Sequence, residues 1–189
     1  MGTIDNRKDV VLLLLYAPGT ANKPHEPILG RTRLMKLIYL LDKEKGISER
    51  LGIKQFYQFY AHNYGPFSEE VFEDVDFLRN VGLIKAEPRG PQSIIEAWEE
   101  EQILAESAPS DSDDLFGAFE QELFELTTRG VHFVEDKLLP DLDENSRGAI
   151  EGIKKGEGAL SLSSLLRYVY SKYPESASKS KLPYLRSNA

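Results

Sequence analysis

YGPFSEEVFEDVDFLRNVGLI, residues 64–84, is the most informative stretch for the fold, because it predicts a turn, a helix and a strand in direct succession. The turn is Tyr64-Gly65-Pro66, where glycine permits a positive φ and proline fixes the backbone of the next position. Ser68 can cap the helix that follows, and two glutamates in its first turn complement the positive end of the helix dipole. The helix runs to Asn80, and a strand of residues 83–86 follows. The simplest role of the turn is therefore to orient this helix.

Two helices are predicted upstream of this stretch. The first spans residues 6–16, and its apolar run VVLLLLYA, residues 10–17, must be covered on every side. The second spans residues 32–45, where apolar residues recur at the spacing i, i+3, i+4 and i+7. The aromatic segment 53–61 favours a strand, although its imperfect alternation leaves a helical interpretation open.

Downstream, two strands at residues 83–86 and 119–126 are expected to form an extended hairpin. A long connection separates these strands, and it holds an acidic insertion around residues 90–118. Three further helices are predicted from periodicity and capping residues, at 130–139, 144–154 and 161–173.

The order of elements predicts a mostly α chain with a small β-sheet, an α+β fold with a winged-helix-like core and additional C-terminal helices. A winged helix has the same order of elements: helix, helix, turn, helix, strand, long connection and strand. The hairpin of its two strands is the wing. We expect residues 1–140 to form this domain with its acidic insertion, 141–175 a C-terminal helical extension, and 176–189 a flexible basic tail.

The charges argue against the usual use of a winged helix. Its third helix normally enters the DNA major groove, but here that helix carries five acids against Arg79 alone. The net charge is −8, and residues 90–128 hold eleven acids and no lysine or arginine, so this helix and hairpin would repel a duplex. The alternative is a DNA-binding transcriptional regulator that uses the basic tail and three residues of the second helix region, Arg31, Arg33 and Lys36.

The acidic insertion offers a different binding surface. Trp98 stands next to Glu99, Glu100 and Glu101, which places an aromatic anchor within an acidic surface suited to a basic protein partner. The apolar run of residues 10–17 exceeds what one buried face requires. That surplus leaves two interpretations open, a two-fold homodimer interface and burial within the chain.

Catalytic and metal chemistry finds little support in the sequence. The three histidines, His25, His62 and His132, are far apart and show no metal-ligand spacing. No cysteine is present, which excludes thiol catalysis and cysteine-based zinc sites and is typical of a reducing compartment. The longest apolar run has eight residues, whereas crossing a bilayer needs about 20. We expect a cytoplasmic, non-enzymatic protein without a cofactor, a metal or a membrane segment.

Several motifs resemble those of a known family. GRTRLMKLIYLL at residues 30–41, YGPFSEEV at 64–71 and LRNVGLI at 78–84 resemble the YwgA-like group of prokaryotic proteins and the Panacea domain of SocA-type antitoxins. The resemblance covers residues 8–130. It implies a winged-helix-like, non-catalytic module of toxin–antitoxin or phage-defence settings, which contacts a toxin-like protein or acts as a regulator. The acidic insertion and the basic C-terminal region depart from the family's pattern, so the identity of the partner does not carry over.

Overall fold

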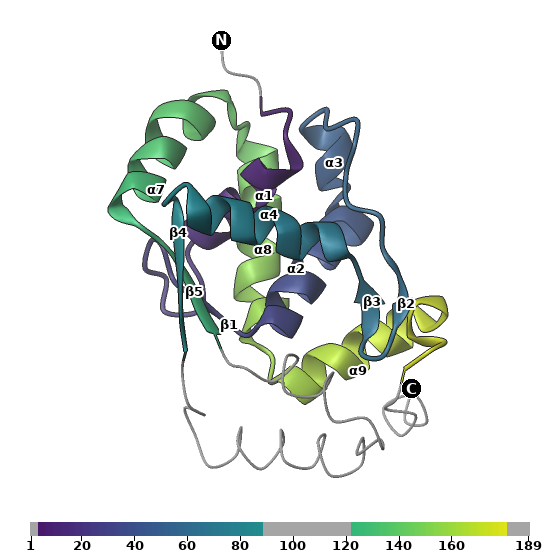
Figure 1. Cartoon of the computed structure of the whole chain (residues 1–189). Helices are drawn as coiled ribbons and strands as arrows, with labels where there is room; N and C mark the ends of the chain where they lie inside the picture. The colour runs from purple at the N-terminus through teal and green to yellow at the C-terminus, as the bar shows by residue number, and fades with distance from the viewer. Residues whose placement is uncertain (1–3, 89–121, 181–189) are drawn as a thin grey trace.

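The computed structural model describes residues 4–88 and 122–180, which form a central group of helices with a small sheet on either side (Figure 1). In chain order the elements are α1 (Arg7–Tyr16), β1 (Ile28–Leu29), α2 (Arg31–Lys45), α3 (Ile47–Arg50), β2 (Tyr60–His62), β3 (Gly65–Phe67), α4 (Glu69–Asn80), β4 (Ile84–Pro88), β5 (Glu122–Leu126), α7 (Thr128–Phe133), η1 (Val134–Leu138), η2 (Leu139–Asp141), α8 (Glu144–Lys155), η3 (Glu157–Ala159), α9 (Leu162–Lys172) and η4 (Pro174–Ala177). The helices predicted around 6–16, 32–45, 68–80, 144–154 and 161–173 are all confirmed.

Both sheets are antiparallel. One has the strand order β1-β5-β4, with Ile28 opposite Phe124 and Ile84 opposite Leu126. The other is the β2–β3 pair. The β4–β5 pair is the hairpin that the sequence predicts, and the mostly helical chain with its small sheets confirms the α+β class. The acidic insertion between these two strands lies outside the described residues.

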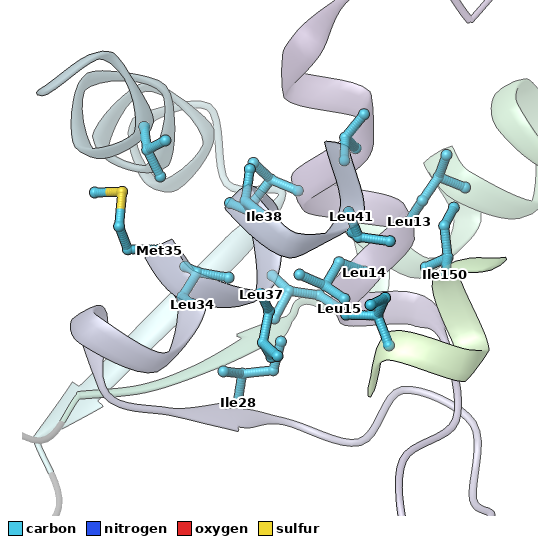
Figure 2. Packing of buried hydrophobic residues seen from close by; sticks show 14 of the residues in the cluster. Leu13, Leu14, Leu15, Ile28, Leu34, Met35, Leu37, Ile38, Leu41 and Ile150 are labelled. Atoms are coloured by element: carbon cyan, nitrogen blue, oxygen red, sulfur yellow. The ribbon is translucent and has the colours of Figure 1, made fainter. Parts of the chain in front are cut away.

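The core is built around α1 and α2. Figure 2 shows leucines of both helices gathered in one cluster with Ile150 of α8. Every side chain from Val10 to Leu15 is at most 2% exposed, so the chain itself covers α1 on all sides. Burial within the chain therefore accounts for the apolar run, and this run gives no argument for a homodimer.

The C-terminal helices share this core. Ile150 and Ile153 of α8 and Leu165 of α9 belong to the same buried cluster as α1 and α2. The prediction of a flexible tail from residue 176 is wrong for residues 176–180, because Ser176 and Ala177 are buried in η4 and Ser180 is also buried. Residues 181–189 lie outside the part of the chain that the structure describes.

Two predicted elements differ from the structure. The strand expected over 53–61 is wrong for most of its length, since a strand begins only at Tyr60. Before it, Tyr57 packs edge-on against Phe56 and Phe59, with ring centroids 5.0 and 6.4 Å away. Contacts among neighbouring rings thus take the place of ladder pairing.

The helix expected at 130–139 begins earlier and ends later. Thr127 caps α7, because its side chain accepts a hydrogen bond from the backbone N–H of Gly130 at 3.0 Å. The chain then continues through η1 and η2 to Asp141. The hydroxyl of Thr127 also donates to the carbonyl of Gly82 at 2.7 Å, so the start of this helix is fastened to the turn before β4.

Candidate functional site

Arg31, a candidate nucleic-acid contact under the alternative function, is held in an intramolecular ion pair. Its Nε lies 2.5 Å from Oε2 of Glu122 at the start of β5, and its guanidinium lies 5.4 Å from the ring centroid of Phe72. Arg79 of α4 approaches the same carboxylate at 3.5 Å. The charge of Glu122, which is 8% exposed, is therefore shared between two arginines. This cluster joins α2, α4 and the hairpin strand β5.

Arg33 also uses its charge inside the fold. Its guanidinium donates to the carbonyl of Gly158 at 3.1 Å and to the carbonyl of Leu160, and so holds the η3 turn against α2. Arg31 and Arg33, at the start of α2, therefore both bind other groups of the same chain.

Lys36 is buried, with 2% of its surface exposed, which argues against its alternative role as a nucleic-acid contact. Its Nζ donates to the carbonyl of Pro66 at 2.9 Å. Burial lowers the pKa of Lys36 to about 7. Lys36 of α2 therefore contacts the Tyr64-Gly65-Pro66 motif, although the two are 30 residues apart in the sequence.

The turn itself lies one position earlier than expected. Asn63 and Tyr64 form it, and Gly65 and Pro66 belong to β3. Gly65 has φ 87°, and a Cβ at this position would stand 2.7 Å from Cε1 of Tyr170 in α9. Glycine is required here both for its conformation and for the close approach of the ring.

Lys154 of α8 is a buried group that sequence reasoning missed. Its side chain is 4% exposed, and Nζ donates to the carbonyls of Leu15 at 3.0 Å, Ala17 at 2.6 Å and Glu26 at 2.5 Å. The last carbonyls of a helix have no intrahelical partner, so this ammonium completes the end of α1. Burial lowers its pKa to about 7, although the nearby Glu26 opposes the shift. The available signal was its position four residues after the buried Ile150.

A cleft of about 510 Å³ lies beside this lysine. Its lining includes Arg33, Lys154, Glu26 and Ser161. The three N–H groups of the Lys154 ammonium are all taken by backbone carbonyls, and Arg33 holds two further carbonyls. The two cations of the cleft therefore stabilise the backbone, and their geometry gives no basis for assigning a ligand.

Helix α4 runs between the β2–β3 hairpin at its start and β4 at its end (Figure 1). Its inner acids pair with the start of α1: Asp74 Oδ2 lies 2.8 Å from Nε of Arg7, Asp74 Oδ1 lies 3.1 Å from Nζ of Lys8, and Glu70 accepts from Arg7. The acids that point outward and are exposed are Glu69, Glu73 and Asp76. The outward side of α4 is therefore acidic, as the sequence predicts.

The other predicted site residues fall in two groups. Trp98, Glu99, Glu100 and Glu101 lie outside the described residues. Among residues 4–88 and 122–180, no group of three or more histidines and acids could hold a metal ion. No helix in this same part of the chain is long and apolar enough to span a membrane.

Comparison with known proteins adds no relative to this description. No protein-family model matches the chain, and no curated protein matches it. The class is therefore defined by the fold and the candidate site: an α+β protein in which Arg31, Arg33, Lys36 and Lys154 are engaged internally and helix α4 presents acids outward.

Proposed function

We propose that the chain is a non-catalytic, winged-helix-like module that acts by binding a protein partner. The order α1, α2, α4, β4, β5 supports the winged-helix-like assignment, as does the pairing of β1 with β5 beside β4. The observation that carries the proposal is the charge of α4, the helix that would enter the major groove. Its exposed acids would repel phosphate, whereas they would attract a basic protein surface.

The internal engagement of Arg31, Arg33 and Lys36 supports the same proposal. A DNA-binding regulator of this fold would need those charges at its surface, yet one is buried and the other two hold groups of the protein itself. The resemblance of residues 8–130 to Panacea-type antitoxins fits a module that binds a toxin-like or other basic protein in an antitoxin or phage-defence setting.

Absence of DNA binding is the first expected result. Fluorescence anisotropy with a labelled duplex should show no binding at moderate salt, because Arg31, Arg33 and Lys36 are engaged within the protein and the exposed acids of α4 repel phosphates. The Arg33→Ala variant should behave identically in this assay, and its unfolding should be easier. Binding that weakens steeply with salt and is lost in Arg33→Ala would contradict the proposal.

Capture of a protein partner through acidic residues is the second expected result. We expect the purified chain to retain a partner from its source cells, and the Glu99→Lys/Glu100→Lys/Glu101→Lys variant to lose it, because the change reverses charge beside Trp98. The matched control reverses three exposed acids elsewhere, Asp136→Lys/Asp141→Lys/Glu144→Lys.

The outcomes of the capture experiment separate cleanly. Equal partner lists from wild type and both variants would discard the acidic insertion as the binding surface. Turnover of any substrate by the purified chain that depends on one of its own side chains would overturn the non-catalytic proposal as a whole.

A further inference from the structure

The β2–β3 hairpin presents an aromatic face. Side chains alternate between the two faces of a strand, so Tyr60 and His62 share one face, and Phe67 joins it because it pairs directly with Tyr60. Ala61 and Pro66 share the opposite face, and the buried Pro66 accepts a hydrogen bond from Lys36 through its backbone carbonyl. Gly65 pairs with His62 and so lies on the ring face, where a Cβ would stand 2.7 Å from the ring of Tyr170 in α9. This face therefore packs against α9 at Gly65, whereas Tyr60, two residues before His62, is 46% exposed.

These rings continue onto α4. Phe67 lies with its centroid 5.7 Å from Tyr60, 4.8 Å from His62 and 5.7 Å from Phe72 of α4. Tyr60 is 46% exposed and Phe77, further along α4, is 49% exposed, and these two are the exposed large hydrophobic side chains of the described residues. Exposed rings of this size mark binding surfaces more often than scattered small apolar residues do.

Acids stand beside the rings. Glu69 and Glu73 are exposed one helical turn apart on α4, and the hydroxyl of Tyr60 donates to Oε1 of Glu69 at 3.4 Å. Among the described residues, no ion pair engages Glu73. We name Tyr60, His62, Phe67, Glu69, Glu73 and Phe77 the hairpin–α4 surface.

The rings of α4 already bind cations of the same chain. Nζ of Lys8 lies 5.3 Å from the ring centroid of Phe77, and the guanidinium of Arg31 lies 5.4 Å from that of Phe72. In both places an acid lies nearby, since Lys8 also pairs with Asp74 and Arg31 with Glu122. Ring faces attract cations, and a neighbouring carboxylate adds to the attraction. The exposed rings offer the same chemistry to a cation from outside.

We propose that the hairpin–α4 surface docks a basic amphipathic segment of a protein partner. A lysine or arginine of that segment lies over the Tyr60 ring and pairs with Glu69 or Glu73, and an apolar residue on the next turn packs against Phe77. This inference rests on the proposed function, because it names where and by which chemistry the partner binds. Charge complementarity selects a basic occupant over an acidic one.

A synthetic peptide tests the proposal without knowledge of the partner. The probe is a fluorescein-labelled helical peptide with lysines spaced four residues apart and leucines one turn away, and its matched control replaces each lysine with glutamate. Wild type should bind the basic peptide and not the acidic one. Tyr60→Ser/Phe77→Ser and Glu69→Lys/Glu73→Lys should each weaken binding by about tenfold or more, as expected for loss of a cation–π contact or of paired charges.

Equal charge reversal elsewhere provides the control for general electrostatics. Asp136→Lys/Asp141→Lys changes two exposed acids of η1 and η2, and it should alter the affinity by less than about threefold, as remote charges are screened by salt. Equal losses in this variant and in Glu69→Lys/Glu73→Lys would overturn the proposal. So would full affinity in Tyr60→Ser/Phe77→Ser, once thermal unfolding shows that the variant is folded.

Two other occupants are distinguished by NMR on the labelled chain. If removal of residues 181–189 shifts the amide resonances of the hairpin and α4, the chain's own basic end covers this surface, and the proposal is overturned. Concentration-dependent shifts confined to the same residues would instead indicate a second copy, with the same consequence. If the peptide proposal fails while a partner is still captured from cells, the proposed function stands and only this surface is wrong.

Discussion

The Gly130→Ala variant is expected to lose most of its stability. Gly130 lies in α7, and a Cβ on it would stand 2.0 Å from the carbonyl oxygen and 3.0 Å from the carbonyl carbon of Leu83. Those are backbone atoms, so no side-chain rotation relieves the clash. The same carbonyl accepts a hydrogen bond from the backbone N–H of Thr127 at 3.0 Å, and moving it would break the contact between the start of α7 and the turn before β4. We expect a loss of about 3 kcal/mol or more in the free energy of unfolding.

Gly148→Ala is the matched control for this change. Gly148 lies in the middle of α8, and a Cβ there meets nothing within 4 Å. Alanine in an open helical position should raise the free energy of unfolding by about 0.5–1 kcal/mol. Urea unfolding followed by circular dichroism measures both variants. Similar midpoints for Gly130→Ala and Gly148→Ala would show that α7 does not pack against the Leu83 carbonyl.

The free energy of unfolding is expected to rise as the pH increases from 7 to 10. Burial lowers the pKa of Lys36 and of Lys154 to about 7, whereas the ordinary value for lysine is 10.5. Between these values the unfolded chain binds more protons than the folded chain, so raising the pH favours the folded state. Each lysine contributes up to about 1.4 kcal/mol per pH unit. Above pH 10 the trend reverses, because burial raises the pKa of Tyr39 to about 12 from its ordinary 10.0.

Lys36→Met tests which group carries this pH dependence. Methionine has a similar length and no charge. The increase in the free energy of unfolding between pH 7 and 10 should therefore be smaller in this variant, by about the contribution of one buried lysine. Lys43→Met, which changes an exposed lysine of the same helix, should leave a steeper profile than Lys36→Met does. Denaturant titrations at a series of pH values give both profiles. A wild-type profile that is flat or falling over this range would contradict the burial of two titrating ammonium groups.

The predictable part of the fold follows from local signals. Helices α1, α2, α4, α8 and α9 lie where apolar periodicity places them, because a helix forms most of its hydrogen bonds within a few residues. Side chains cap α1, α8 and α9, whereas the Ser68 side chain makes no capping hydrogen bond to α4. The β4–β5 hairpin is also predictable from its pattern, although its strands are far apart in the chain. The strand predicted for the aromatic segment before β2 was wrong. Its rings pack on one another, and neither the two-residue period of a strand nor the 3.6-residue period of a helix describes that arrangement.

The candidate site was predictable only in part. The acidic character of α4 is predictable from its residues. The partners of the basic residues elsewhere in the chain are not. Arg31 pairs with Glu122, 91 positions away, and Lys154 caps α1 from 139 positions beyond Leu15. The exposed rings of Tyr60 and Phe77 also escaped prediction, because their exposure depends on how the β2–β3 hairpin and α4 pack against the rest of the chain.

The positions of the main helices, the α+β class and the sign of the charge on α4 follow from the sequence, because they depend on local periodicity and composition. Tertiary structure alone decided which charges remain at the surface. Lys36 and Lys154 are buried, and Arg31 and Arg33 hold other parts of the chain, only because distant segments pack beside them. A side chain's type sets its charge, but its surroundings set whether that charge meets solvent, a partner or the backbone of the same molecule.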